Sequence, residues 1–391
     1  MYANPQDARP LQRGATARAL ETAARKLARS QKCTRSGARF LIAQTHGFAT
    51  WRALIRHLDA LRNTRQPVAQ FEAAADAIVD GHEGVLIELI RQNPQLVRTR
   101  SLRIHNATLL HYVSANGVEG FRQRTPSNIV AIAKTLLDAG AEIDAVADVY
   151  GGGATALGLA ATSAHPESAG VQRDLMRLLL DRGAALDTGR PGIVRACLAN
   201  GRRDAAEFLA EQGARLDLES AAGVGRLDLV ATLVRRDGRL SRGATRAQLN
   251  AGFMWACEYG RTAVVEFLLE TGVKPATPQD PSSNGQRSGI TGLHWAAYGG
   301  HTDIVKLLVE HGAPVNAIED AYGGSPLQWA LYGWNPPDGA VKPQYYEVVS
   351  LLVAAGAMLD ERWFGSGDEI RGAVARKAKA DPRMQAALNR R

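Results

Sequence analysis

Aromatic residues recur at similar spacing in the second half of the chain, and their type suits contact with another protein. Aligning the segments MWACEYG, HWAAYGG and QWALYGW gives one column of tryptophans and one of tyrosines: Trp255, Trp295 and Trp329, and Tyr259, Tyr298 and Tyr332. Tyrosine offers a large contact area and a hydroxyl group at low entropic cost, and aromatic residues are enriched at interface hot spots. The tyrosine column therefore predicts a partner-binding surface, which Tyr322 and Trp334 would extend. The tryptophan column is more typical of packing between repeats.

A polar segment around His165 is the second candidate site. The segment AATSAHPESAGVQR also contains Ser163, Glu167 and Arg173. A histidine beside hydroxyl, carboxylate and guanidinium groups in a loop is consistent with a catalytic or ligand-binding site. The same residues are equally typical of a loop that is held by its own hydrogen bonds. Both interpretations stay open, and the second is favoured.

Established catalytic and metal-binding motifs are missing from the sequence. It contains no P-loop, no HExxH, no GxSxG and no GxGxxG after a strand, and the run GGGA at 151–154 is interpreted as a turn. The nine histidines form no metal-ligand set, and Cys33, Cys197 and Cys257 form no CxxC pair. We therefore expect no enzyme activity, no metal and no cofactor. The few, widely spaced cysteines favour a reducing compartment such as the cytoplasm.

One pattern recurs along the chain and predicts the elements that would position these residues. An apolar helical stretch ends at a glycine, usually followed by alanine, in IAKTLLDAGA (132–141), LMRLLLDRGA (175–184), AAEFLAEQGA (205–214), VVEFLLETGV (264–273), IVKLLVEHGA (304–313) and VVSLLVAAGA (348–357). Apolar residues such as Ile304, Leu307 and Leu308 share one helical face. A glycine such as Gly312 suits the left-handed position after a helix.

These units resemble the ankyrin repeat family. The unit 290–317 contains the opening Thr291, Leu293, His294 and Ala296 of the family pattern T-P-L-H-x-A, with Gly292 in place of proline. The resemblance covers roughly residues 70–360. It implies an all-α solenoid of about eight helix-turn-helix units with short hairpin fingers, in which His294 and His111 brace neighbouring loops. It also implies that the tyrosine column faces the concave surface of the array.

Three units carry proline-containing inserts between their helices, at 117–128, 162–172 and 333–346. In a solenoid, inserts of one type emerge on one face, which is often the binding face. We therefore expect these segments to be exposed loops.

The two ends of the chain differ in charge from its centre. Residues 1–66 contain 13 Lys and Arg against 3 Asp and Glu, residues 361–391 contain 8 against 4, and residues 67–360 contain 26 against 32. Helices are expected at 14–30 and, as a helix-turn-helix with Gly47 at the turn and Thr50 as cap, at 36–62. Part of this stretch resembles a helical segment that precedes ankyrin arrays in some bacterial proteins. We predict a basic helical N-terminal module (1–66), a repeat array (67–360) and C-terminal capping helices (361–391).

These observations predict a non-catalytic protein-interaction module or scaffold in a bacterial cytoplasm. Its partner, another protein, would bind the concave face and fingers around Tyr259, Trp295, Tyr298, Tyr322, Trp329, Tyr332 and Trp334. One alternative is an enzyme or small-ligand receptor that uses the loop around His165. Another is a nucleic-acid-associated regulator that uses the basic N-terminus, where Arg52, Arg56 and Arg62 could contact phosphates. No stretch is long and apolar enough to predict a membrane span, and Met1 to Arg13 contains no apolar region of the kind found in secretory signals.

Overall fold

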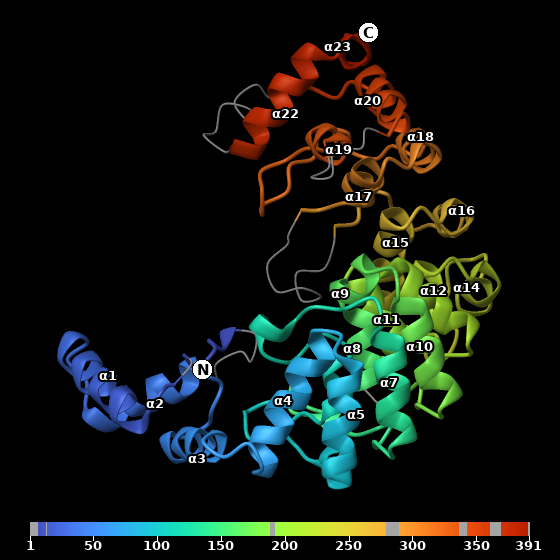
Figure 1. Cartoon of the computed structure of the whole chain (residues 1–391). Coiled ribbons are helices and arrows are strands. Elements are labelled where there is room, and N and C mark those ends of the chain that lie inside the picture. Colours follow the sequence, from blue (N-terminus) through green and yellow to red (C-terminus); the bar gives the residue numbers. More distant parts are fainter. Residues whose placement is uncertain are drawn as a thin grey trace. The chain divides into compact units, whose positions relative to one another are not determined.

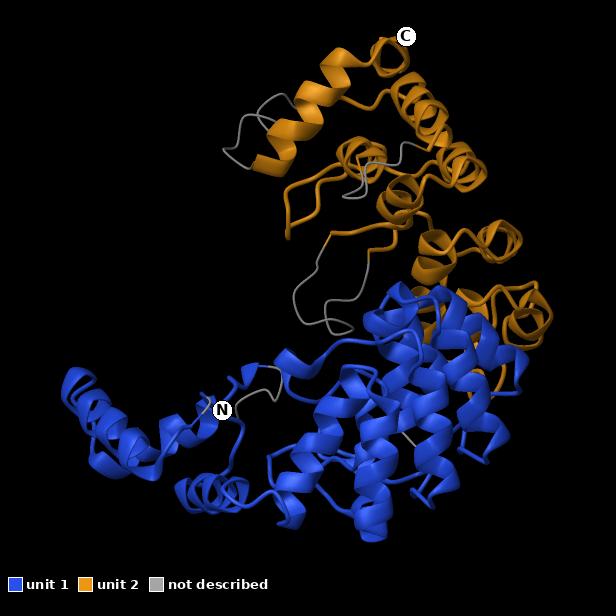
Figure 2. Ribbon diagram, in the orientation of Figure 1, with its two compact units in different colours: residues 1–215 blue, residues 216–391 orange. Residues whose placement is uncertain are grey.

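The computed structural model describes residues 7–12, 14–187, 192–278, 289–335, 342–359 and 369–389. The chain divides into two compact units, residues 1–215 and 216–391 (Figure 2). The boundary between them lies inside the predicted repeat array, so the predicted boundaries after residues 66 and 360 stay a prediction. Each unit is described by itself below.

The first unit is helical, with one short hairpin among its described residues (Figure 1). Its elements are α1 (Ala17–Ser30), α2 (Arg35–Thr45), α3 (Trp51–Leu61), α4 (Pro67–Val79), α5 (Glu83–Gln92), the 3-10 helix η2 (Pro94–Arg98), α6 (Leu109–Tyr112), the 3-10 helix η3 (Gly120–Arg122), α7 (Ile129–Asp138), β1 (Val146–Ala147), β2 (Ala154–Thr155), α8 (Ala156–Thr162), α9 (Ala164–Ser168), α10 (Gln172–Asp181), α11 (Ile193–Ala199) and α12 (Arg203–Glu211). The antiparallel strands pair Val146 with Thr155 and Ala147 with Ala154, so the GGGA run lies at the hairpin turn, as predicted.

The second unit consists of helices in its described residues. They are α13 (Leu218–Gly223), α14 (Leu227–Leu233), α15 (Arg246–Glu258), α16 (Thr262–Glu270), α17 (Gly292–Gly299), α18 (Thr302–Glu310), α19 (Pro326–Trp334), α20 (Gln344–Ala354), α22 (Glu369–Ala380) and α23 (Pro382–Leu388). One continuous core runs from Leu218 to Ala387 and takes residues from successive helix pairs. This arrangement is the stacked packing that the repeat pattern predicts.

The best repeat unit shows how its sequence ends and positions the helices. The Thr291 side chain caps α17 reciprocally with His294, and α18 ends at the C-cap His311. Gly312 follows with φ at 78°, a left-handed conformation that a residue with a side chain adopts only under strain. The predicted role of Gly312 is therefore confirmed. The predicted role of His294 is confirmed by its hydrogen bond to the Gly324 carbonyl in the neighbouring loop, at 3.2 Å.

The N-terminal helices have their own small core. Leu54, Leu58, Phe48 and Ile42 pack together with alanines of α1 and α2. The turn between α2 and α3 contains Gly47 at φ 78°, and the Thr50 hydroxyl accepts a hydrogen bond from the Ala53 amide at 3.1 Å. The predicted helix-turn-helix is thus present.

Two of the three inserts are not the exposed loops that were expected. In the insert 117–128, Val118, Glu119 and Arg122 are buried. In the insert 162–172, residues 164–168 form α9, and the Gln172 amide donates hydrogen bonds to the carbonyls of residues 160, 161 and 163. Both expectations were wrong. Insert 117–128 packs against α4 of the preceding repeat, where Arg122 donates to Glu72, and insert 162–172 folds back onto its own repeat. Residues 336–341 of the third insert lie outside the described residues.

Candidate partner-binding surface

Five aromatic side chains of the second unit lie in ring contact. We call Trp295, Tyr298, Tyr322, Trp329 and Tyr332 the aromatic patch. The Trp295 and Trp329 rings meet edge to face with centroids 5.1 Å apart, and Tyr298 lies edge to face with Trp329 at 6.0 Å. Tyr332 stacks with Tyr298 at 6.3 Å, and Tyr322 contacts Trp329 at 6.5 Å. Offset and edge-to-face pairs at these distances are favourable arrangements of aromatic rings.

The members of the aromatic patch differ in exposure. Tyr298, Tyr322 and Tyr332 expose 41%, 55% and 39% of their surface. Trp295 is buried and Trp329 is half-buried, so the tryptophans form the base on which the tyrosines rest. This division agrees with the packing role that the tryptophan column suggested. The surface available to a partner therefore consists mainly of the three tyrosines.

A buried carboxylate shapes the loop that carries Tyr322. Glu319 is fully buried, and its carboxylate accepts hydrogen bonds from the amides of Ala321 at 2.6 Å, Tyr322 at 2.9 Å and Gly324 at 3.0 Å. In addition, the Arg371 guanidinium donates to the Tyr322 carbonyl at 2.7 Å. The Tyr322 backbone is thus held in place by several hydrogen bonds.

His294 connects this loop to α17. Its Nδ1 accepts a hydrogen bond from the Thr291 amide at 3.1 Å, so its Nε2 carries the proton and donates to the Gly324 carbonyl at 3.2 Å. Burial lowers the pKa of His294 to about 4, because a charged imidazolium would lose its hydration there. A side chain at position 324 would force its neighbours to shift, since an added Cβ would lie 2.9 Å from the Trp329 ring. Together these contacts fix the loop against the base of the patch.

Tyr259 does not belong to this surface. It is only 7% exposed, and it follows Trp255 by four positions, whereas Tyr298 follows Trp295 by three. One extra residue rotates a side chain by about 100° around a helix. The predicted tyrosine column is therefore wrong at Tyr259, where the tyrosine is turned away from the position that Tyr298 occupies.

Trp334 is also buried rather than available to a partner. It is fully buried in the core of the second unit, and its ring contacts Tyr346 at 6.3 Å. The Lys377 ammonium lies 4.8 Å from the ring centroid. The prediction that Trp334 extends the binding surface does not fit these contacts, because its ring packs under the C-terminal helices.

The His165 segment does not bring its predicted residues together. Glu167 forms an ion pair with Arg202, and Arg173 pairs with Glu211 at 3.0 Å. His165 is exposed and lines a cavity of about 790 Å³ together with Asn116 and other residues of the first unit. The described residues contain no group of three or more His, Cys, Asp and Glu side chains that could hold a metal ion.

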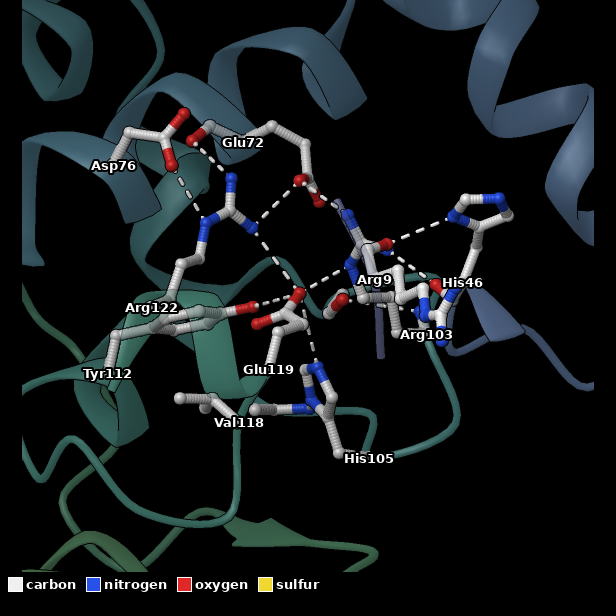
Figure 3. Close-up of polar contacts among 12 residues, drawn as sticks. Arg9, His46, Glu72, Asp76, Arg103, His105, Tyr112, Val118, Glu119 and Arg122 are labelled. Atoms are coloured by element: carbon white, nitrogen blue, oxygen red, sulfur yellow. Dashed lines mark hydrogen bonds and ion pairs between the residues drawn. The ribbon is translucent and has the colours of Figure 1, made fainter. Parts of the chain in front are cut away.

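The first unit also contains a buried ionic cluster that the sequence did not predict (Figure 3). We define the cluster as Glu72, Arg103, Glu119 and Arg122, all buried. Arg122 donates to Glu72 at 2.8 Å and to Glu119 at 3.3 Å. Arg103 donates to Glu72 at 3.1 Å and pairs with Glu119 through its Nε. The two arginines and two glutamates pair with one another at buried positions, and Arg122 also pairs with the exposed Asp76 at 2.7 Å.

The cluster joins three segments that are distant in sequence. Glu72 lies on α4, Arg103 precedes α6, and Glu119 and Arg122 belong to the insert 117–128. Arg103 also donates to the His46 carbonyl at 2.8 Å, which ties the N-terminal helices to the first repeat. This network therefore holds the three segments together and has a structural role.

Electrostatics keep the cluster ionised. Burial by itself would raise the pKa of Glu119, but a hydrogen bond from His105 and the charges of Arg103 and Arg122 hold it below its ordinary value. The Tyr112 hydroxyl also donates to Glu119, at 3.3 Å. The spacing of Glu119 and Arg122 by three positions was the one sequence signal for this cluster.

Comparison with known proteins explains the repeated architecture. A family model described as ankyrin repeats, in three copies, matches residues 253–362, which include the whole aromatic patch. The chain contains ankyrin repeats. Ankyrin repeats generally serve as protein-interaction modules and not as catalytic domains. The predicted family and helical solenoid fold are thereby confirmed.

Individual relatives match the chain in part. The palmitoyltransferase Hip14 of Drosophila melanogaster is 32% identical over 102 residues, 26% of this chain and 13% of that protein. A putative ankyrin repeat protein of Rickettsia bellii is 40% identical, over 19% of this chain and 38% of that protein. The crystal structure of the human ASB11 ankyrin repeat domain has 23% sequence identity and a TM-score of 0.34, and covers 73% of this chain and 99% of that domain. The chain thus spans less than two fifths of the length of these two sequence relatives.

No helix among the described residues is both long and apolar enough to cross a membrane.

Proposed function

We propose that this protein is a non-catalytic interaction module that binds a partner protein through the exposed tyrosines of the aromatic patch. The observation that carries the proposal is the ring contact among Tyr298, Tyr322, Trp329 and Tyr332, with three of these rings partly exposed. Exposed aromatic groups that rest on a fixed base are typical of interface hot spots. Residues Tyr259 and Trp334 are left out of the proposed surface.

The proposed mechanism is burial of preorganised aromatic side chains. The loop that carries Tyr322 is held by Glu319, and the Tyr298 carbonyl accepts a hydrogen bond from the Tyr345 hydroxyl at 2.5 Å. Side chains and loops that are already ordered lose little freedom on binding, which increases affinity. The partner should therefore offer an apolar surface with hydrogen-bond acceptors for the tyrosine hydroxyls.

The experiment that tests the proposal is site-specific photo-crosslinking in the native cell. A photoreactive phenylalanine analogue replaces Tyr322 or Tyr332 in the full chain, and Tyr150 in the first unit serves as the matched control because it is also an exposed tyrosine. We expect the same protein to be crosslinked from positions 322 and 332 and not from position 150. Crosslinking from position 150 alone, or from none of the three, would contradict the proposed surface.

A small-ligand receptor is the second candidate, and the cavity of about 790 Å³ lined by His165, Asn116 and Tyr150 favours it. Its volume is within the range of ligand pockets in proteins. A metabolite that raises the melting temperature of the wild type but not of His165→Ala would support this candidate. If no metabolite tested changes the melting temperature, the small-ligand receptor is excluded as a function.

We also propose that the protein acts in the cytoplasm. The support is the chemistry of its cysteines: Cys33, Cys197 and Cys257 are unpaired, and Cys197 and Cys257 are buried. Burial raises the pKa of the Cys197 thiol to about 12. Unpaired thiols of this kind suit a reducing compartment. The expected bacterial origin stays a prediction.

A further inference from the structure

The outer face of α1 carries a stripe of cations. We define the basic stripe as Arg18, Arg25, Lys26 and Arg29, all exposed. With 3.6 residues per turn these positions fall on one face of the helix, over a length of about 16 Å. Thr22 lies among them and is exposed as well. The opposite face of α1 packs into the core of the N-terminal helices through Ala24, which is fully buried.

The described chain leaves most of this charge without a counter-ion. The one acidic residue of α1, Glu21, pairs with Arg35 and Arg39 of α2 and reaches Arg25 at 3.8 Å. The hydrogen bond from Arg39 and the charge of Arg35 hold the pKa of Glu21 below its ordinary value, so this carboxylate is already engaged. Among the residues that the structure describes, Arg18, Lys26 and Arg29 form no ion pair.

Like charges four positions apart on a helix, such as Arg25 and Arg29, destabilise it. An external polyanion would remove this repulsion. The N-terminal helices dock on the first repeat through other groups, since Arg103 bonds to the His46 carbonyl and the Ile104 amide to the Gly47 carbonyl. Docking of these helices therefore does not cover the basic stripe.

The residues between the cations indicate which polyanion fits. Thr22 and Ser30 are small and polar, and they line one shallow hollow together with Arg25, Lys26 and Arg29. The hollow presents no aromatic ring on which a single-stranded base could stack and no large apolar group that could enter a lipid layer. The exposed apolar residues Phe40 and Leu41 lie on α2 and not on the stripe.

We propose that the basic stripe of α1 binds the phosphate backbone of double-stranded DNA without sequence preference. Guanidinium groups form paired hydrogen bonds with phosphate oxygens. The major groove of DNA, about 12 Å wide, admits an α-helix, whereas the major groove of double-stranded RNA is too narrow. Arginine, lysine and hydroxyl side chains all bind phosphate oxygens, and phosphate contacts carry no sequence information.

The test measures how DNA affinity depends on salt. Each phosphate contact contributes a slope of about 0.9 to the plot of log affinity against log salt concentration. The full chain is titrated with a short duplex of mixed sequence at several salt concentrations. The stripe variant is Arg18→Ala/Arg25→Ala/Lys26→Ala/Arg29→Ala, and alanine favours helix at all four positions.

A control variant loses the same number of positive charges elsewhere. Arg91, Arg177, Arg203 and Arg239 are exposed, and each lies beside an acidic residue of its own segment. The control changes these four arginines to alanine. Circular dichroism and thermal denaturation verify that both variants are folded.

We expect the wild type and the control to bind the duplex with the same slope, and the slope of the stripe variant to fall by about 3 to 4. An unchanged slope in the stripe variant would overturn the proposal, and so would no binding by the wild type at low salt. Tighter binding to single-stranded DNA, to double-stranded RNA or to vesicles containing phosphatidylserine than to the DNA duplex would show that the stripe binds a different ligand. That result would also overturn the proposal.

Discussion

The rings of Tyr298 and Tyr332 stack across α17 and α19, with centroids 6.3 Å apart and planes inclined by 30°. Each ring is also more than one third exposed. The two residues occupy the same position in successive repeats, so their contact follows directly from the stacking of the repeats. A partner that covers one ring therefore covers both, and the pair acts as one anchor of fixed geometry.

Replacement of Gly324 by a residue with a side chain should disturb the tryptophans that form the base of the aromatic patch. In Gly324→Ala the new Cβ would lie 2.9 Å from the indole ring. We expect a loss of about 1–3 kcal/mol in the free energy of unfolding, because overpacking forces side chains from their preferred positions. Thermal and urea denaturation measure this loss. Gly84→Ala is the control, since an added Cβ there meets no atom within 4 Å, and an unaltered stability of Gly324→Ala would contradict the described packing.

The buried ionic cluster should matter more for stability than any exposed ion pair. Arg122→Met removes one positive charge and leaves Arg103 as the one arginine among the described residues that pairs with Glu72 and Glu119. We expect the free energy of unfolding of the first unit to fall by about 3–5 kcal/mol, the usual effect of breaking a buried pair. Urea denaturation measures this change.

The matched control for the cluster is Arg91→Met, which breaks the exposed pair with Glu88. Exposed pairs contribute about 1 kcal/mol or less. If Arg122→Met and Arg91→Met lower the free energy of unfolding equally, the buried ionic cluster does not stabilise the first unit more than an exposed ion pair does.

Stability should fall as the solution becomes acidic, because His294 is buried in its neutral form. Its pKa is lowered from 6.5 to about 4 in the folded protein. The unfolded chain therefore binds a proton first as the pH falls. The stabilisation is fully present above pH 6.5 and is lost progressively down to about pH 4, by about 1.4 kcal/mol per pH unit at most.

Urea denaturation of the second unit at several pH values tests this dependence. His294→Gln should reduce the slope of stability against pH in that range, whereas His82→Gln, which changes an exposed histidine of the first unit, should not. If the His294→Gln variant keeps the wild-type slope of stability against pH, His294 is not the group responsible for the pH dependence.

The sequence predicted the elements of the fold because their signals are local. Apolar residues at helical spacing and a following glycine define α18, and both features occur within one short segment. The Thr50 cap and the turn at Gly47 were predictable for the same reason. Tertiary contacts were not needed for any of these inferences.

The candidate site was less predictable because small shifts in register decide exposure. The aromatic residues were recognised, but the one-residue difference in spacing between Trp255–Tyr259 and Trp295–Tyr298 turns Tyr259 inward. The ionic cluster was missed because Glu72, Arg103 and Glu119 come from separate segments. Only the packing of the first repeats brings those charges together.

The most direct test of the central claim is the affinity of the crosslinked partner for the variant Tyr298→Ala/Tyr332→Ala, measured by calorimetry with the purified full chain. Hot-spot aromatic residues contribute about 2 kcal/mol or more, which corresponds to a roughly 30-fold weaker dissociation constant. We predict at least that loss, with a melting temperature close to that of the wild type. An affinity unchanged in a folded double variant would contradict the proposal that the aromatic patch binds the partner.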